Sequence, residues 1–223
     1  VLTIVADINY SVINKALTAN LVSTKKALPF RLKAGDKIGG AFSLNKKLKR
    51  KLESAWVFYS YPGPSLQSKH YYDYLVLDGL LFDGLSSLLF QKLREDKPLV
   101  YGLASEINGF SNTGSYMMIF NCQKKNVETL DSALNEVLSQ LIEGEIDEKE
   151  FSQAKERLLN GSLLALDSLD HRLDFILDNE VYSLEEYSLE QIEKKLNSVS
   201  VSSVKKLCGK IINKKPARLV MAS

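Results

Sequence analysis

Two apolar runs rich in β-branched and aromatic residues, PLVYGLASEI at 98–107 and SYMMIFNCQ at 115–123, lie close together in the sequence. They are joined by NGFSNTG, and a short connection rich in Gly, Asn and Ser is typical of a hairpin loop. Two strands joined in this way pair antiparallel and need further strands or helices to bury their apolar side chains. The pattern therefore predicts a largely antiparallel sheet.

Three other segments read as strands. VLTIVADI at 1–8 is predicted to be a buried strand, and Asn9 or Ser11 could cap the short helix that follows it. SAWVFYSY at 54–61 is a second strand pattern, which ends at a Pro-Gly-Pro turn. ARLVMA at 217–222 is predicted to close the chain as a final strand.

Helical patterns dominate the second half of the chain. A long helix is predicted over about 67–95, and a second, amphipathic helix carries leucines between Leu130 and Leu141. Asp147 and Glu150 resemble a capping box, and two or three more helices are expected within 170–213. With strands early and helices late, the sequence predicts an α+β fold, a mostly antiparallel sheet covered on one face by helices.

The length of 223 residues suits one large or two small domains. We expect a single domain over 1–223, with an opening strand and helix at 1–22, a linker-like loop at 23–50 and the main α+β body at 51–223. Because Val1 already lies inside a strand pattern and is not a methionine, we expect the chain to be a piece of a longer protein.

Composition narrows the possible partners. The 29 cationic and 27 anionic residues nearly cancel, so overall charge does not steer the protein to nucleic acid or to an anionic membrane. The basic run KKLKRK at 46–51 leaves nucleic-acid binding open as an alternative, but no aromatic residues interleave with it, and a solvated loop is favoured. The sequence lacks an apolar run of about 18 residues, so we expect no membrane span. Two isolated cysteines favour a reducing, cytoplasmic location.

The residues needed for most hydrolytic sites are missing. The two histidines, His70 and His171, lie far apart, and neither belongs to an H-x-x-E-H or H-E-x-x-H motif. His70 is interpreted as a surface or capping residue. No serine occupies a G-x-S-x-G turn, and there is no glycine-rich phosphate loop. We therefore expect no catalytic residue and no bound metal or cofactor in this chain.

Four segments together resemble a known family. GLSSLLFQKLREDKPLVYGL at 84–103 resembles the signature of the second half-domain of pitrilysin- and insulinase-type zinc peptidases, whose zinc helix carries the inverted H-x-x-E-H motif. VLTIVADIN resembles that family's strand-into-helix opening, SYPGPS with YYDYLVLDGLL its Pro-Gly segment and long helix, and GEIDEKEFSQAKERLLNGSLLALDS its later capped helix. The segments cover most of 1–195 in the family's order and spacing.

The resemblance implies a role for two residues. In that family, two halves of related fold close around an unfolded peptide, and the zinc and general base lie in the first half. An arginine and a tyrosine seven residues apart in the second half reach the substrate, and Arg94 and Tyr101 fall on those positions. Tyr101 would donate its hydroxyl toward the scissile carbonyl, and Arg94 would hydrogen-bond substrate carbonyls. The zinc-bearing half would be in the same polypeptide or in a partner subunit.

Other interpretations remain open at this point. Arg94 could simply complement the helix macrodipole, and Tyr101 could pack on a strand with its hydroxyl in water. Two departures from the family pattern, Leu88 in place of a common arginine and Pro98 in place of the usual glycine, weaken the assignment. The intact protein could be an active hydrolase or a catalytically inactive homologue that serves as a scaffold or assembly subunit.

Overall fold

The computed structural model describes residues 2–21, 44–184 and 188–223. Its centre is a five-stranded sheet with the strand order β1-β5-β2-β4-β3. The strands are β1 (Asn45–Lys49), β2 (Ala55–Pro62), β3 (Val100–Gly109), β4 (Gly114–Cys122) and β5 (Ala217–Ala222). Only the β1–β5 pair is parallel within this sheet, and the other three pairs are antiparallel. The predicted hairpin is confirmed as β3 and β4, which close at Gly109 and Gly114.

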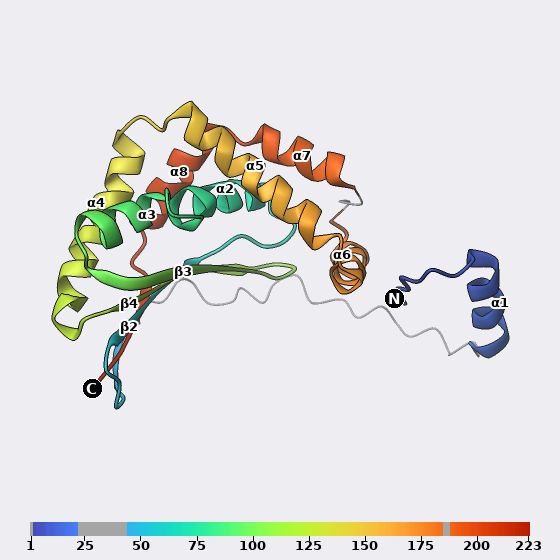
Figure 1. Cartoon of the computed structure of the whole chain (residues 1–223), viewed down its shortest axis with the longest axis horizontal. Helices are drawn as coiled ribbons and strands as arrows, with labels where there is room; N and C mark the ends of the chain where they lie inside the picture. Colours follow the sequence, from blue (N-terminus) through green and yellow to red (C-terminus); the bar gives the residue numbers. More distant parts are fainter. Residues whose placement is uncertain (1, 22–43, 185–187) are drawn as a thin grey trace.

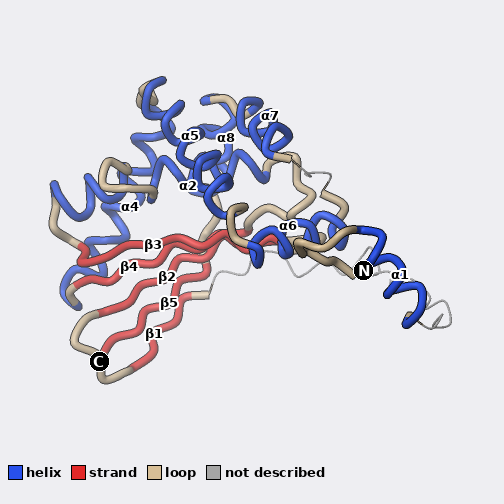
Figure 2. The backbone as a smooth tube through the Cα atoms, turned by 45° about the vertical axis from the view of Figure 1, so that its right-hand side comes forward, coloured by secondary structure: helices blue, strands red, loops and turns tan. Residues whose placement is uncertain are grey.

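The helices of the body gather over one face of the sheet (Figures 1 and 2). They are α2 (Tyr71–Phe82), α3 (Leu88–Phe90), α4 (Val127–Glu143), α5 (Glu148–Ala165), α6 (Leu169–Tyr182), α7 (Leu189–Ser198) and α8 (Val201–Ile212), with α1 (Tyr10–Asn20) standing apart. A short 3-10 turn, η2 (Lys124–Asn126), precedes α4. The predicted α+β fold, a mostly antiparallel sheet covered on one face, is confirmed.

The core lies between the sheet and these helices. Alternate residues of β2 and β4 point toward the helices and are buried, among them Val57, Met118 and Phe120. Leu77 and Leu81 of α2 are fully buried on the opposite side of this layer. Fully burying an aliphatic side chain contributes about 1.5–3 kcal/mol, so this two-layer contact is what holds the body together.

The prediction of one continuous helix over 67–95 is wrong. α2 ends at Phe82, where Asp83 takes an extended conformation and Gly84 has φ +83°. Glycine adopts this left-handed conformation without steric cost, so the chain turns there before α3 begins. A π-helix, η1 (Gln91–Asp96), directly follows α3 and replaces the last turns of the predicted helix.

Three other differences concern strands. Asn45–Lys49, predicted to lie in a loop, form the edge strand β1, and much of the basic run KKLKRK lies in that strand. Lysines are common on edge strands because they discourage pairing with other chains. Residues 2–6 form no strand, although VLTIVADI has a strand pattern. Trp56, in the strand pattern at 54–61, is 39% exposed on the sheet face that the helices leave uncovered.

Candidate functional site

The candidate site is built on the corner between η1 and β3. Leu93 of the π-helix and Val100 of the strand are both buried and anchor the two sides of the corner. The backbone N–H of Leu99 donates to the Leu93 carbonyl at 2.8 Å, which closes the turn. π-Helical turns are rare and often mark functional positions, so this corner is a local irregularity held rigidly by the core.

Arg94 projects from the π-helix into solvent. Its guanidinium carbon lies 5.0 Å from the centre of the Phe90 ring, one turn earlier, which is a cation–π distance. The neighbouring lysines are already paired, Lys92 with Asp96 at 2.8 Å and Lys97 with Glu136 at 2.5 Å. Arg94 forms no ion pair with any residue that the structure describes, so its donors are available to a ligand.

Tyr101 is the extra residue of a β-bulge. Val100 pairs with Cys122 and Gly102 with the next residue, Asn121, so Tyr101 has no partner of its own on β4. Bulges occur beside active sites, where they re-aim a side chain. The Tyr101 side chain is 54% exposed, and β3 is an edge strand of the sheet. Arg94 and Tyr101 therefore lie on the two arms of one rigid corner, and neither side chain is buried in the domain.

The structure shows where the two residues that depart from the family pattern lie. Leu88 packs against the core, and the exposed Pro98 separates η1 from β3. The Ser87 hydroxyl is buried and has no hydrogen-bond partner among the described residues.

The uncovered sheet face beside the corner is apolar. The alternation and register of the strands place six large side chains there, namely Trp56, Phe58, Met117, Ile119, Leu219 and Met221. All except Trp56 are half-buried by their neighbours. A peptide with exposed apolar side chains would find complementary surface on this face.

Neither histidine belongs to a metal site. No group of three or more His, Cys, Asp or Glu side chains in the described ranges could hold a metal ion. His70 precedes α2 without capping it through its side chain, and its ring nitrogen Nδ1 lies 2.8 Å from Asp73 Oδ2. His171 lines a mostly apolar hollow of about 300 Å³ between α2, α5, α6 and α7.

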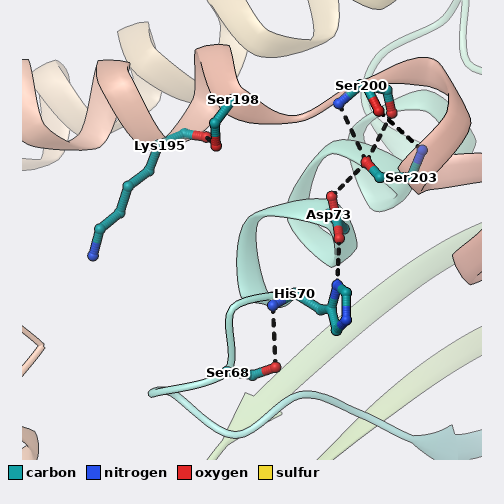
Figure 3. Close-up of polar contacts among 7 residues, drawn as sticks. All are labelled: Ser68, His70, Asp73, Lys195, Ser198, Ser200 and Ser203. Carbon is teal, nitrogen blue, oxygen red and sulfur yellow. Dashed lines mark hydrogen bonds and ion pairs between the residues drawn. The ribbon is translucent and has the colours of Figure 1, made fainter.

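Sequence reasoning missed a polar cluster around Asp73 (Figure 3). The buried Asp73 carboxylate accepts a hydrogen bond from the Ser203 hydroxyl at 2.7 Å and pairs with His70 through its other oxygen. These residues line a hollow of about 670 Å³, together with Lys195, whose Nζ donates to the Leu184 carbonyl at 3.3 Å. The spacing of His70 and Asp73 was a visible signal, but Ser203 is 130 residues from Asp73.

This cluster is not a catalytic triad. In a triad, the histidine lies between the nucleophile and the carboxylate and takes the nucleophile's proton. Here Asp73 lies between Ser203 and His70, so the imidazole does not contact the hydroxyl. Ser203 also belongs to the capping box with Ser200 that begins α8. The cluster therefore joins the starts of α2 and α8.

A second polar group, partly buried and centred on Asp131 of α4, holds the sheet to the helices. Asp131 accepts from the Tyr59 hydroxyl on β2 and from Arg218 Nε on β5, the latter at 2.9 Å. Burial and the hydrogen bond to Asp131 raise the pKa of Tyr59 above its ordinary value. Tyr59 is thus a protonated structural donor and is not available for proton transfer at neutral pH.

Comparisons of sequence with known proteins point to one family. Residues 1–158 match the sequence model of the peptidase M16 inactive domain. A Bacillus subtilis protein named "Uncharacterized zinc protease YmxG" is 26% identical over 163 residues, 73% of this chain and 40% of the relative. The chain spans 40–45% of the length of its first curated relatives.

Solved structures agree on the fold. A conserved protein from Enterococcus faecalis V583 superposes with a TM-score of 0.76 at 20% identity, over 97% of this chain and 50% of that one. The peptidase M16 inactive domain from Pseudomonas fluorescens superposes with a TM-score of 0.69 at 18% identity, over 79% of this chain and 42% of that one.

Among the helices described, none combines the length and apolar character needed to cross a bilayer.

Proposed function

Because the chain belongs to the M16 peptidase family and matches its inactive domain, we propose that it is the substrate-gripping half of a zinc metalloendopeptidase that cleaves unfolded peptides. The zinc-bearing half is an upstream domain of the same polypeptide or a separate subunit. The observation that carries the proposal is the placement of Arg94 and Tyr101, both exposed, at the two irregularities of one rigid corner.

Each side chain has a chemistry suited to a peptide backbone. Tyr101 donates its phenolic O–H toward the scissile carbonyl, where negative charge develops as the bond is attacked. Arg94 presents a planar set of N–H donors that stays protonated and can hold two backbone carbonyls at once. Since the corner is anchored by the buried Leu93 and Val100, both donors are held in place before substrate arrives.

The residues that the structure describes do not fit a catalytic zinc ion. Such an ion needs about three protein ligands and an open position for water, and the part of the chain that the structure describes holds no such group. In this proposal the metal and the general base therefore belong to the other half. The contribution of this chain is confined to binding and orienting the peptide and to one hydrogen bond at the reacting carbonyl.

The test reconstitutes this chain with its zinc-bearing half and measures cleavage of an unfolded peptide. Replacing Tyr101 by Phe removes one hydroxyl and should lower turnover by about 10- to 1000-fold, the cost of one lost oxyanion donor. Tyr182→Phe, on α6, is the matched control and should cleave at the wild-type rate. Unchanged turnover in Tyr101→Phe would reduce Tyr101 to a packing residue.

The alternative is a catalytically inactive homologue that serves as a scaffold or assembly subunit. It is favoured by Leu88 and Pro98, which depart from the family pattern at this same corner. The reconstitution separates the two functions. A stable complex of wild-type halves that cleaves no unfolded peptide would favour the scaffold.

A further inference from the structure

Four lysines from two separate elements line one hollow at the edge of the sheet. The hollow has a volume of about 470 Å³, and it is lined by Lys47 and Lys49 from β1 and by Lys124 and Lys125 from η2. All four side chains are exposed. Glu128 is the only acidic side chain among the lining residues that the structure describes. Four ammonium groups therefore share a small space with one carboxylate, in a protein whose total charge is nearly balanced.

The protection of an edge strand explains only half of this cluster. Lys47 and Lys49 alternate along β1 and so share one face of it, and lysines on an edge strand discourage pairing with other chains. Lys124 and Lys125 lie in the 3-10 turn after β4, where no strand edge needs protection.

The charges of this cluster are not neutralised within the described ranges. No ion pair there joins any of the four lysines to an acidic side chain. The one recorded bond is that of the Lys124 ammonium, which donates to the Ser223 hydroxyl. Like charges held close together repel one another, so an anionic ligand in the hollow would relieve this repulsion.

The lining of the hollow favours an acidic peptide over a bare phosphate. Val127 and Val220, both buried, contribute apolar surface to it. A phosphate group would leave this surface without a partner, whereas a peptide can present carboxylates to the lysines and aliphatic carbons to the valines. Lysine is a point charge on a flexible stem, so four lysines can follow carboxylates at varied spacing along a peptide.

The hollow lies at the same end of the sheet as the corner that carries Arg94 and Tyr101, and on the opposite edge (Figure 2). One row of paired residues crosses the sheet from the corner to the hollow, namely Gly102, Asn121, Trp56, Met221 and Leu48. The row spans four gaps between strands, which is about 19 Å at about 4.8 Å for each gap. An extended peptide rises about 3.3 Å per residue, so about six residues cover this distance.

We infer that the hollow binds an acidic segment of the peptide substrate, about six or more residues from the bond that is cleaved. The inference rests on the proposed function, and it names a class of substrate for it. The lysines would pair with carboxylates of the peptide while its scissile carbonyl lies at the corner. Peptides that carry Asp or Glu at this distance would bind more tightly than peptides that lack them.

The first experiment measures binding to this chain alone. The probe is a fluorescent peptide in which glutamates alternate with valines, and its affinity should fall as salt is added. The double variant Lys47→Gln/Lys125→Gln removes one cation from each element and should weaken binding by about 3- to 30-fold. The control is Lys149→Gln/Lys194→Gln, which removes two exposed lysines from α5 and α7 and should bind as wild type does.

The second experiment measures cleavage by the reconstituted peptidase. Two peptides of equal composition carry the acidic block either beside the cleaved bond or about six residues from it. The peptide with the distant block should have the lower KM, and this advantage should disappear in Lys47→Gln/Lys125→Gln. Its kcat should stay unchanged in that variant, because the hollow binds the peptide away from the reacting bond.

Three outcomes would overturn the inference. Equal weakening in the two double variants would show a general attraction by the field of the protein. Tripolyphosphate that binds more tightly than the acidic peptide would make the hollow a phosphate site. Equal KM values for the two peptides would show that the hollow does not contact the substrate. Because the binding experiment needs no cleavage, its failure is distinguishable from failure of the proposed function, which absence of cleavage would show.

Discussion

The Tyr116 hydroxyl on β4 donates a hydrogen bond to the Asp78 carboxylate on α2, with 2.9 Å between the two oxygens. Tyr116 is fully buried, and the bond crosses the interface between the sheet and the helix that covers its centre. Burial raises the pKa of Asp78, although hydrogen bonds from Ser105 and Tyr116 partly oppose the shift. The contact between sheet and helix therefore contains an acid that resists ionisation.

The raised pKa of Asp78 predicts that the free energy of unfolding falls as the pH rises. An acid whose pKa is higher in the folded state stabilises the fold at low pH, and that stability is lost as the pH rises from its unfolded pKa through its raised folded pKa. Asp78→Asn cannot ionise and should escape the loss, so its unfolding free energy should improve relative to wild type between about pH 3.5 and pH 7. Urea unfolding at a series of pH values measures this difference.

Tyr116→Phe provides the second arm of this test. It removes a bond that lowers the pKa of Asp78, so the decline of stability with pH should be steeper than in wild type. A constant difference between Asp78→Asn and wild type at every pH would contradict the assigned shift.

Replacing Arg94 should weaken substrate binding and catalysis and should change the stability of the fold little. Arg94→Ala should lower kcat/KM of the reconstituted peptidase by about 10- to 100-fold, the effect of losing a charged hydrogen-bond donor to substrate. Arg94→Lys should fall between alanine and wild type, because lysine keeps the charge without the planar set of donors. Loss of the cation–π contact between Arg94 and Phe90 should lower the free energy of unfolding by at most about 1 kcal/mol.

The control for Arg94→Ala is Arg50→Ala, which removes an exposed arginine before β2 and should leave kcat/KM unchanged. Equal losses in the Arg50 and Arg94 variants would point to general electrostatic attraction of the peptide. Peptide cleavage and urea unfolding on the same preparations separate binding from folding.

The two thiols should be inert in the native chain. Cys122 and Cys208 are free and buried, and burial raises the pKa of Cys208 to about 12. An aromatic disulfide reagent at pH 8 should therefore modify neither thiol in buffer and both in urea. Modification of either cysteine within minutes under native conditions would show that the layer over the sheet opens readily.

Two glycines form a matched pair for testing backbone packing. A Cβ at Gly114 would overlap the Pro64 backbone, where the Gly63 N–H donates to the Gly114 carbonyl at 2.9 Å. Gly114→Ala should therefore destabilise the protein by about 1–3 kcal/mol. A Cβ at Gly161, within α5, would meet nothing within 4 Å, so Gly161→Ala should stabilise by about 0.5–1 kcal/mol. Urea midpoints that move in the same direction would contradict this reasoning.

Patterns of apolar residues predicted the hairpin β3–β4, the helix α4 and the overall α+β class, because these depend on local periodicity. The break in the long helix was missed, since Gly84 is one glycine among leucines and its residue type alone does not reveal a positive φ. Strand β1 was missed because its lysines have no apolar alternation.

At the candidate site, the sequence singled out two residues and did not show how they are held. Arg94 and Tyr101 were named from a resemblance, whereas the π-helix and the bulge depend on pairing with β4 and on the buried Leu93. The Asp73 cluster was missed because Ser203 lies 130 residues from Asp73 in the sequence. Contacts between residues so distant in the chain leave no periodic trace in a single sequence.

The bulge at Tyr101 makes the site sensitive to chain length. A strand that lost one residue between Val100 and Gly102 could pair evenly with β4, because the extra residue has no partner there. The sheet would survive the deletion of Tyr101, while its phenol would be lost from the corner. Under the proposed function, deletion of this one codon would remove the hydroxyl donor and leave the fold of the half-domain intact.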